Sequence, residues 1–447
     1  MKTDRTIGRG LSVCSYRHPL LSNINLYLGC LKDLQDSSAR RWTPHAAAVA
    51  AVLMSLDATH PLFVRLGNAQ ACMESDFSGR RRTGKTYNGL IKALTRQAPR
   101  VLPAIKKHLR QKVLESFRRI PRTCGWRLLA VDGTKEQLPR TVSHEAFFGI
   151  ADNGKFPQAL VTAVVEVHTG LLWDWRIDRG CGSEKGHLEE MGPTLPEDVL
   201  LLADGNFVGY NIWSALVDAG KWFLIRVGGN VDLLTDLFPD TVLERQGNIV
   251  YAWPKARQRR CPPLRLRLIR LGRGSESVHL LTNVLDESRL SQESAAILYR
   301  LRWGAEIFYR TFKRTMDLAR LKSRSGARAS LELEWALITC CILSLLGTQA
   351  LHQSGKDPRR LSPARLMHAC RDALFHGTSV RIRTGDPFQR ALAQAVRDSY
   401  VRHGSKKSRH RPITKNTPKS HQLKPPNLRP ATRSERTLAQ EQQKLAA

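Results

Sequence analysis

The chain has 447 residues, with 71 Lys plus Arg against 39 Asp plus Glu, which gives a formal net charge of +32. Hydrophobic residues make up 42% of the sequence, enough to bury a core, so a wholly disordered protein is excluded. Because so large a positive charge favours a polyanionic partner, we expect the chain to bind nucleic acid.

The cysteines and the apolar segments limit the class of protein further. Nine cysteines include no CxxC pair, and no histidine pair with metal-ligand spacing accompanies them, so a structural zinc site is not expected. No apolar stretch of the signal-peptide type follows the charged N-terminus. The longest apolar run, residues 336–346, is shorter than the roughly 20 residues that cross a bilayer. We therefore expect a buried helix there, and a cytoplasmic protein with no membrane partner.

The first 120 residues predict helices. Residues 44–56 are rich in Ala and Leu and carry a Pro where a helix would begin. Residues 87–97 and 101–119 have apolar side chains at helical spacing, which predicts two amphipathic helices. We interpret residues 1–120 as a helical N-terminal DNA-binding region.

After residue 120 the pattern changes to short apolar strands that alternate with helices. Residues 126–134 and 199–206 predict buried strands, and residues 159–177 predict a hairpin. This order of strands and helices predicts an α/β fold.

Four regions complete the predicted organisation. Residues 228–287 contain three strand-like segments with basic loops and predict a β-rich insertion. A long helix is expected from residue 291 to about 321, and a helical part over 322–400, which closes a catalytic domain spanning 121–400. Residues 401–447 are dominated by Lys, Arg, His, Pro, Ser and Gln and predict a disordered basic tail.

The stretch GRRRTGKT, residues 79–86, matches the pattern of a nucleotide-binding P-loop. A P-loop follows a buried strand, however, and the preceding residues ACMESDFS show no strand pattern. It also needs small residues so that backbone N–H groups can close around phosphate. An ATP-driven motor is therefore the less favoured interpretation, and no nucleotide partner is expected. The basic side chains expected instead to hold DNA phosphates at a helix start are Arg80, Arg81, Arg82 and Lys85.

Two acids are expected at strand ends. Asp132 and Asp204 each close a predicted buried strand and are each followed by Gly. Two carboxylates brought together repel unless a cation lies between them, and Mg²⁺ is the natural cation for oxygen ligands. From these residues alone, a pair of turn-forming Asp-Gly steps is an equally good interpretation.

A third acid lies in the predicted helix 299–313. Four polar side chains share one face of this helix, within roughly 60° of one another, namely Tyr299, Arg302, Glu306 and Lys313. The alternative is a solvated helix with an ordinary ion pair between residues four apart. The apolar residues among them favour a helix that is largely buried.

This spacing, Tyr-x₂-Arg-x₃-Glu-x₆-Lys, with Asp-Gly-Thr and a second strand-end Asp upstream, resembles the DDE transposases of bacterial insertion sequences, specifically the insertion-sequence-four family. The resemblance covers roughly residues 80–345. It implies an RNase H-like fold with Asp132, Asp204 and Glu306 as the catalytic triad. The β-rich insertion between the second and third acids agrees with that layout. One departure is Gly205, which stands where many relatives have Arg directly after the second acid.

The resemblance also implies an activity, which is cut-and-paste DNA transposition. The triad would hold two Mg²⁺ ions, with Mn²⁺ as a substitute and Asp132 bridging both, for cleavage at the element ends and transfer of the 3′-OH into target DNA. Tyr299, Arg302 and Lys313 would hold the DNA backbone near the cut. The implied partners are double-stranded DNA and a second copy of the chain, at the bacterial nucleoid. A transposase-derived DNA-binding protein without catalysis is the alternative.

Two tryptophans are candidates for stacking on a flipped base, which hairpin-forming enzymes need. Trp303 follows Arg302 on the predicted helix, and we expect it in the core. Trp253 lies in the insertion beside basic residues, and of the two it is the preferred candidate for contact with DNA.

Overall fold

The computed structural model describes residues 18–34, 41–74, 77, 83–150, 154–238, 248–274, 277–318, 321–376, 387–398 and 424–446. Its centre is a ten-stranded mixed sheet in the order β10-β6-β7-β8-β9-β5-β4-β1-β2-β3. The strands are β1 (Arg127–Gln137), β2 (Gln158–Glu166), β3 (Leu172–Arg179), β4 (Val199–Ala203), β5 (Trp222–Val227), β6 (Asp232–Thr235), β7 (Ile249–Ala252), β8 (Leu264–Leu271), β9 (Val278–Thr282) and β10 (Asn427–Pro430). This arrangement confirms the predicted α/β class.

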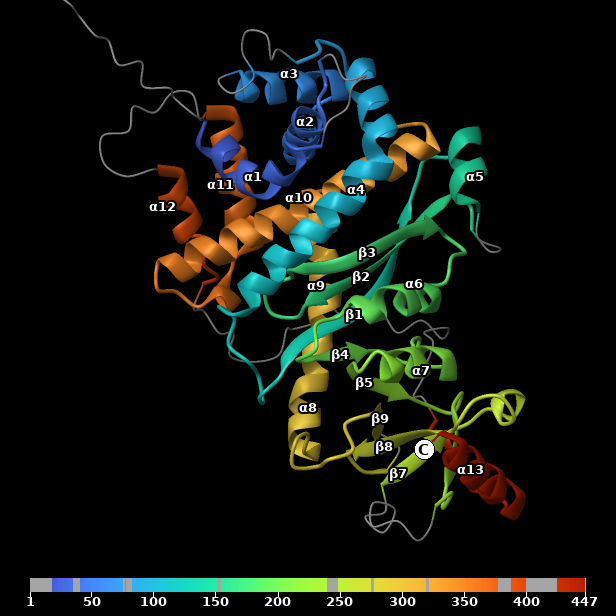
Figure 1. Cartoon of the computed structure of the whole chain (residues 1–447). Coiled ribbons are helices and arrows are strands. Elements are labelled where there is room, and N and C mark those ends of the chain that lie inside the picture. Colours follow the sequence, from blue (N-terminus) through green and yellow to red (C-terminus); the bar gives the residue numbers. More distant parts are fainter. Residues whose placement is uncertain are drawn as a thin grey trace, which may run out of the picture.

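Helices cover both faces of the sheet and one of its ends. Figure 1 shows α6 and α7 on one face, α8 and α9 on the other, and the N-terminal helices together with α10–α12 beyond β3. The helices are α1 (Pro19–Leu28), α2 (Pro44–Leu56), α3 (Leu62–Met73), α4 (Tyr87–Phe117), α5 (Val142–Phe148), α6 (Glu184–Met191), α7 (Tyr210–Asp218), α8 (Gln292–Arg300), α9 (Gly304–Arg310), α10 (Gly326–Gln353), α11 (Pro363–His376), α12 (Pro387–Ala393) and α13 (Arg433–Ala446).

The two helices predicted over 87–97 and 101–119 are one helix, α4, of 31 residues. It continues through Pro99 and Pro103, although each proline removes a backbone hydrogen bond. The apolar face runs the whole length of α4 and packs against β3, α2 and α10. Burial of that face outweighs the two missing bonds, which is why the prediction of a break was wrong.

The apolar run 336–346 also belongs to a longer helix, α10, of 28 residues. The whole helix α10, unlike the run alone, is long and apolar enough to cross a membrane by length and composition. However, 83% of its most apolar window is buried inside the protein. The helix lies in the core, as expected for this run.

The predicted insertion does not form a separate sheet. Its strands β7, β8 and β9 continue the central sheet through the antiparallel pairing of β9 with β5. A further strand, β6, was not predicted. It is only four residues long, which is too short to show a clear period-two pattern in the sequence. It pairs with β7 at a single register position, Leu234 with Tyr251.

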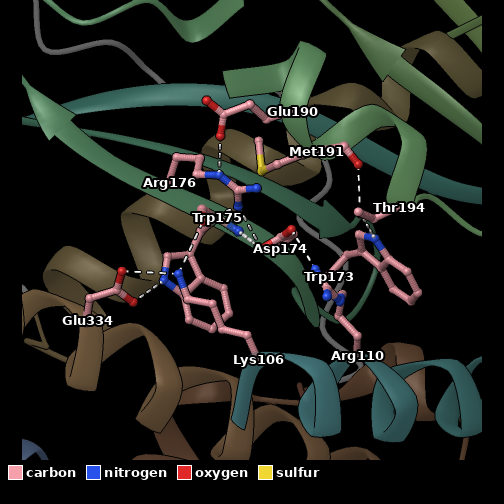
Figure 2. A network of polar contacts seen from close by, with 10 residues as sticks. All are labelled: Lys106, Arg110, Trp173, Asp174, Trp175, Arg176, Glu190, Met191, Thr194 and Glu334. Atoms are coloured by element: carbon pink, nitrogen blue, oxygen red, sulfur yellow. Dashed lines mark hydrogen bonds and ion pairs between the residues drawn. The ribbon is translucent and has the colours of Figure 1, made fainter. Parts of the chain in front are cut away.

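A buried polar network ties the N-terminal helices to the sheet (Figure 2). Asp174 of β3 is 1% exposed, and its carboxylate accepts from Arg110 Nη1 of α4 at 2.9 Å and from Arg176 Nη1 at 3.1 Å. The guanidinium of Arg176 continues outward to Glu190 of α6 at 2.8 Å. Because each end of the chain of contacts lies on a different element, the network fixes α4 and α6 against β3.

The same strand makes a second polar link, which reaches α10. The indole Nε1 of Trp175 donates to Glu334 at 2.7 Å, and Lys106 of α4 pairs with the same carboxylate at 3.1 Å. The Lys106 ammonium also lies 4.4 Å from the centroid of the Trp175 ring, a cation–π contact (Figure 2). The N-terminal helices and the 322–400 part therefore share one interface with β3.

Residues 424–446 form a strand and a helix, so the prediction of a disordered tail over 401–447 was wrong for them. Residues 401–423 and 447 lie outside the described residues. Strand β10 pairs in parallel with β6. Helix α13 begins with a capping box, in which the Thr432 side chain accepts from Glu435 N and the Glu435 carboxylate accepts from Thr432 N at 2.9 Å. Ala431 and Ala439 then pack on a small apolar cluster with Trp253. Local composition concealed this because the apolar partners lie far away in the sequence.

Acid is expected to release this C-terminal segment. Two Arg429 bonds, at 2.7 and 2.9 Å, hold the pKa of Glu435 at about 2, below its ordinary value of 4.5. A depressed carboxyl pKa contributes stability that is present above pH 4.5 and is lost as the pH falls toward 2. Fluorescence of the buried Trp253 should therefore change between pH 4.5 and 2. Glu435→Gln should already show the change at pH 7, with docking weakened by about 1–3 kcal/mol. A variant that titrates like the parent would contradict this role for Glu435.

Candidate catalytic site

The first two acids, Asp132 and Asp204, lie just beyond the point where the pairing of β1 with β4 ends. The strands run parallel and pair from Arg127–Val199 to Ala130–Leu202. Asp204 directly follows β4, as predicted. Asp132 does not end its strand, because β1 continues to Gln137 in antiparallel pairing with β2. The interpretation of Asp132-Gly133 as a strand end with a turn was therefore wrong. Asp132 lies instead on the free edge that β1 exposes beyond the last β4 pair.

Glu306 is supplied by α9, which packs across β1 and β2. The helix is anchored by Tyr309, whose buried hydroxyl donates to the Asp132 carbonyl at 2.7 Å and to the Val161 carbonyl at 3.0 Å. Tyr309 was not singled out in the sequence, since only its spacing from Glu306 hints at a contact with the sheet. Its two bonds place Glu306 on the same edge as Asp132.

The long helix predicted over 291–321 is interrupted. The helix α8 ends at Arg300, a 3₁₀ turn spans Leu301–Trp303, α9 follows, and Thr311–Thr315 form a π-helical turn. The four polar residues thus do not share one continuous α-helical face. At the start of α9, Gly304 lies close to the backbone of the β2–β3 hairpin.

Gly304→Ala is expected to disrupt both the fold and the site. A Cβ at residue 304 would lie 2.8 Å from Val167 Cα and would overlap the Val167 carbonyl, and backbone atoms cannot rotate away. We expect a loss of about 1–3 kcal/mol in the free energy of unfolding, together with displacement of Glu306. Thermal unfolding measures the first effect and DNA cleavage the second. Gly67→Ala is the control, since a Cβ there meets nothing within 4 Å. Equal stability of the two variants would contradict the contact.

The charges of Asp204 and Glu306 act on Asp132. The pKa of Asp132 is raised to about 6, first by burial and then by the nearby charges of Asp204 and Glu306. A hydrogen bond from Gly133 N, at 2.9 Å, and the charge of Arg302 oppose this rise. Asp132 belongs to β1, Asp204 follows the neighbouring strand β4, and Glu306 belongs to α9, which packs on β1.

Arg302 holds Glu306 in an ion pair. Its Nη2 donates to Glu306 Oε1 at 3.0 Å, the contact between residues four apart that was weighed as the alternative. Arg302 is buried nonetheless, so the pair is not a solvated surface contact. The ring of Tyr299 lies 6.0 Å from Arg302 Cζ, and burial raises the pKa of Tyr299 to about 12.

Lys313 is bound to the extension of β1. Its Nζ donates to the Lys135 carbonyl at 3.0 Å and pairs with Glu136 Oε2 at 2.8 Å. This ammonium therefore lies near the same edge as Asp132, although it belongs to the π-helical turn.

The donor set fits a hard divalent cation. All the candidate ligands are carboxylate oxygens. Burial, and after it the charges of Asp204 and Glu306, disfavour the ionised form of Asp132, and a bound cation would offset both effects. Within the described part of the chain, no three His, Cys, Asp or Glu side chains are grouped closely enough to hold an ion as they stand. The ion pair of Glu306 with Arg302 supplies a reason, because it directs that carboxylate to a guanidinium.

The two tryptophans are placed opposite to expectation. Trp253 is 4% exposed, its Nε1 donates to the Cys261 carbonyl at 2.8 Å, and α13 packs against it. Its preferred role as a DNA-stacking residue is therefore contradicted by its burial. Trp303, expected in the core, is 54% exposed and lies 5.3 Å from Arg302 Cζ. The 3₁₀ turn rotates Trp303 away from the sheet.

The P-loop interpretation of residues 79–86 receives no support from the fold. The element before the stretch is the helix α3, not a strand, and Thr86 caps the start of α4 by accepting from Gly89 N at 3.2 Å. Lys85 is exposed at this helix start. The three predicted DNA-contacting residues Arg80, Arg81 and Arg82 lie outside the described residues.

Comparison with known proteins finds similar sequences and a solved structure that aligns with the chain. Residues 125–343 match a family described as the transposase DDE domain. The chain is 26% identical over 257 residues to the transposase InsG for insertion sequence element IS4 of Escherichia coli (strain K12). This match covers 54% of the present chain, which spans 57% of that relative. The cryo-EM structure of a piggyBac transposase synaptic complex with hairpin DNA aligns over 88% of this chain and 86% of that one, with 14% identity and a TM-score of 0.37. A TM-score this low establishes no common fold.

Proposed function

We propose that the protein catalyses cut-and-paste DNA transposition, because residues 125–343 match the transposase DDE domain and the chain is similar to an IS4 transposase. It would cleave DNA at the ends of an element and join the 3′-OH to target DNA. The observation that carries this proposal is the placement of the acids: Asp132 belongs to β1, Asp204 directly follows the neighbouring strand β4, and Glu306 belongs to α9, which packs on β1. The alternative is a transposase-derived protein that binds DNA without catalysis.

We propose that the β3-β2-β1-β4-β5 half of the sheet is an RNase H-like core. Three antiparallel strands followed by two parallel ones, with α6 and α7 in the connections, support this. In this layout the 228–287 strands extend the core as the insertion between Asp204 and Glu306. The helices before residue 121 would serve DNA binding.

The proposed mechanism assigns each residue a task. Asp132, Asp204 and Glu306 would hold divalent cations, with Mg²⁺ as the expected ion and Mn²⁺ as a substitute. When bound, such ions lower the pKa of an attacking water or hydroxyl and stabilise the leaving oxygen. Arg302 would exchange its bond to Glu306 for a DNA phosphate, which frees that carboxylate for the cation.

Tyr299 and Lys313 would position the same DNA backbone. Lys313 already lies at the β1 edge, and its ammonium can exchange Glu136 for a phosphate oxygen. Tyr299 supports the guanidinium of Arg302 from beneath. The net charge of +32 supports double-stranded DNA as the partner, with Arg80, Arg81, Arg82 and Lys85 as further phosphate contacts.

The test of this function is a cleavage assay. The full chain is incubated with a duplex carrying the inverted repeat that flanks its own gene, with Mg²⁺ and with EDTA. The proposal predicts end cleavage and strand transfer that require the cation. Binding without cleavage in any divalent ion would favour the silent DNA-binding alternative. Two copies per pair of ends, measured by light scattering of the complex, would agree with the proposed homodimer on nucleoid DNA in the bacterial cytoplasm.

Trp303 replaces Trp253 as the proposed base-stacking residue, because it is exposed beside Arg302. Trp303→Ala is expected to weaken capture of an unpaired base by about 1–3 kcal/mol. The measurement is 2-aminopurine fluorescence at the terminal position of the end DNA. Trp253→Phe, a conservative change in the buried cluster, is the control and should leave the signal unchanged. A change in the signal with Trp253→Phe and none with Trp303→Ala would instead favour Trp253 as the base-stacking residue.

A further inference from the structure

Gly133, directly after Asp132, leaves room for a carboxyl group from another element. A Cβ built at residue 133 would overlap the carboxyl group of Glu184. The backbone at 133 is not in the left-handed region, so no turn requires a glycine here. What glycine provides is space, and Glu184 fills it.

Glu184 is held in this position by the start of α6. It is the first residue of that helix, and the preceding Ser183 side chain accepts from Gly186 N at 3.1 Å, which caps the helix. The side chain is half-buried, and it forms no hydrogen bond or ion pair with any residue that the structure describes. Burial raises the pKa of Glu184, the charge of Asp204 raises it further, and Lys135 opposes both.

The four acids approach the sheet edge from different sides. Successive side chains of a strand point to opposite faces, so Glu184 reaches β1 from the face opposite to the Asp132 side chain. Asp204, at the end of the neighbouring strand, is the acid whose charge acts on both. Glu306 belongs to α9, which covers the sheet face opposite to α6 (Figure 1). The edge of β1 therefore lies between Glu184 of α6 and Glu306 of α9.

We propose that Glu184 is a fourth carboxylate of the catalytic site and that, together with Asp204, it helps to bind the divalent cation. This inference rests on the proposed function, since it concerns the same cation. A half-buried carboxylate without a partner is costly, and a cation offsets that cost. The competing explanation is that Glu184 only interacts with the N-terminus of α6, and it predicts no effect on cation binding.

The test is a calorimetric titration of the full chain with Mn²⁺. Glu184→Gln is expected to raise the dissociation constant at least about tenfold. Glu189→Gln, an exposed acid on the same helix, should bind like the parent. Asp132→Asn should also weaken binding. Parent-like affinity of Glu184→Gln, together with a loss in Asp132→Asn, would overturn this inference alone. No effect of Asp132→Asn would overturn the proposed function as well.

A second variant addresses the site without changing any acid. Gly133→Ala should displace the Glu184 carboxyl, which can move because it is the far end of a flexible side chain. We expect it to weaken Mn²⁺ binding about as much as Glu184→Gln does. The double variant should bind no more weakly than Glu184→Gln alone, because both changes remove the same contact. Multiplied losses, or parent-like affinity of Gly133→Ala, would contradict the assigned contact.

Discussion

Asp132→Asn, Asp204→Asn and Glu306→Gln are each expected to lower Mg²⁺-dependent cleavage of end DNA by about 10³-fold or more. Loss of an outer partner of a metal ligand typically costs about 10- to 100-fold, and loss of the ligand itself should cost more. The three changes keep the volume and remove one negative charge. The measurement is the single-turnover rate of strand cleavage at saturating protein.

DNA binding separates this expectation from misfolding. Each variant should bind end DNA at least as tightly as the parent, because removing an acid lowers the repulsion of phosphate. Asp218→Asn is the matched control. Asp218 lies on α7, beyond Asp204, and its carboxylate accepts from Ser214 Oγ at 3.0 Å. Cleavage at the parent rate by any of the three acid variants would remove that residue from the site.

Asp174→Ala is expected to lower the free energy of unfolding by about 3 kcal/mol. Removing one partner of a buried ion pair typically costs about 3–5 kcal/mol. The lower end applies here because Arg110 and Arg176 are 27% and 29% exposed and so keep part of their hydration. The expected physical consequence is looser packing of α4 and α6 on β3. Chemical denaturation with far-UV circular dichroism provides the measurement.

Glu190→Ala is the control within the same network. Its carboxylate is 62% exposed and pairs with the outer side of Arg176, so we expect a loss below about 1 kcal/mol. If both variants lost the same free energy, the buried position of Asp174 would not be what stabilises this interface.

Two of the candidate acids, Asp204 and Glu306, could be predicted from patterns in the residues next to them. Asp204 is the first polar residue after a run of five buried apolar residues, and the strand ends directly before it. Glu306 was predicted from its spacing from Tyr299 and Arg302. Despite the 3₁₀ turn, both Tyr299 and Glu306 contact Arg302 in the structure.

The failures concern partners that are distant in sequence. The strand β1 continues past Asp132 because β2 pairs with it. The residues of β1 themselves carry no signal of that pairing. Trp253 is buried by α13, which lies about 180 residues later. The Thr432 and Glu435 capping box was a local signal for α13 that the basic composition concealed.

Glu184 shows a third kind of failure. Its residue type and its place at a helix start are ordinary, and only the missing Cβ of Gly133 connects it to the site. In the sequence, Gly133 suggested a turn because an Asp-Gly step commonly forms one. Close approach of a side chain to backbone leaves no periodic pattern, so the contact could be found only in three dimensions.

We expect these acids to bind the divalent cation on which DNA cleavage depends, and Asp204→Cys tests this most directly. A thiolate binds Mg²⁺ poorly and softer ions better. Asp204→Cys is expected to lose end cleavage with Mg²⁺ and to regain part of it with Mn²⁺, while Asp204→Ala stays inactive with both ions. Cleavage by Asp204→Cys at the parent rate with Mg²⁺ would contradict this expectation.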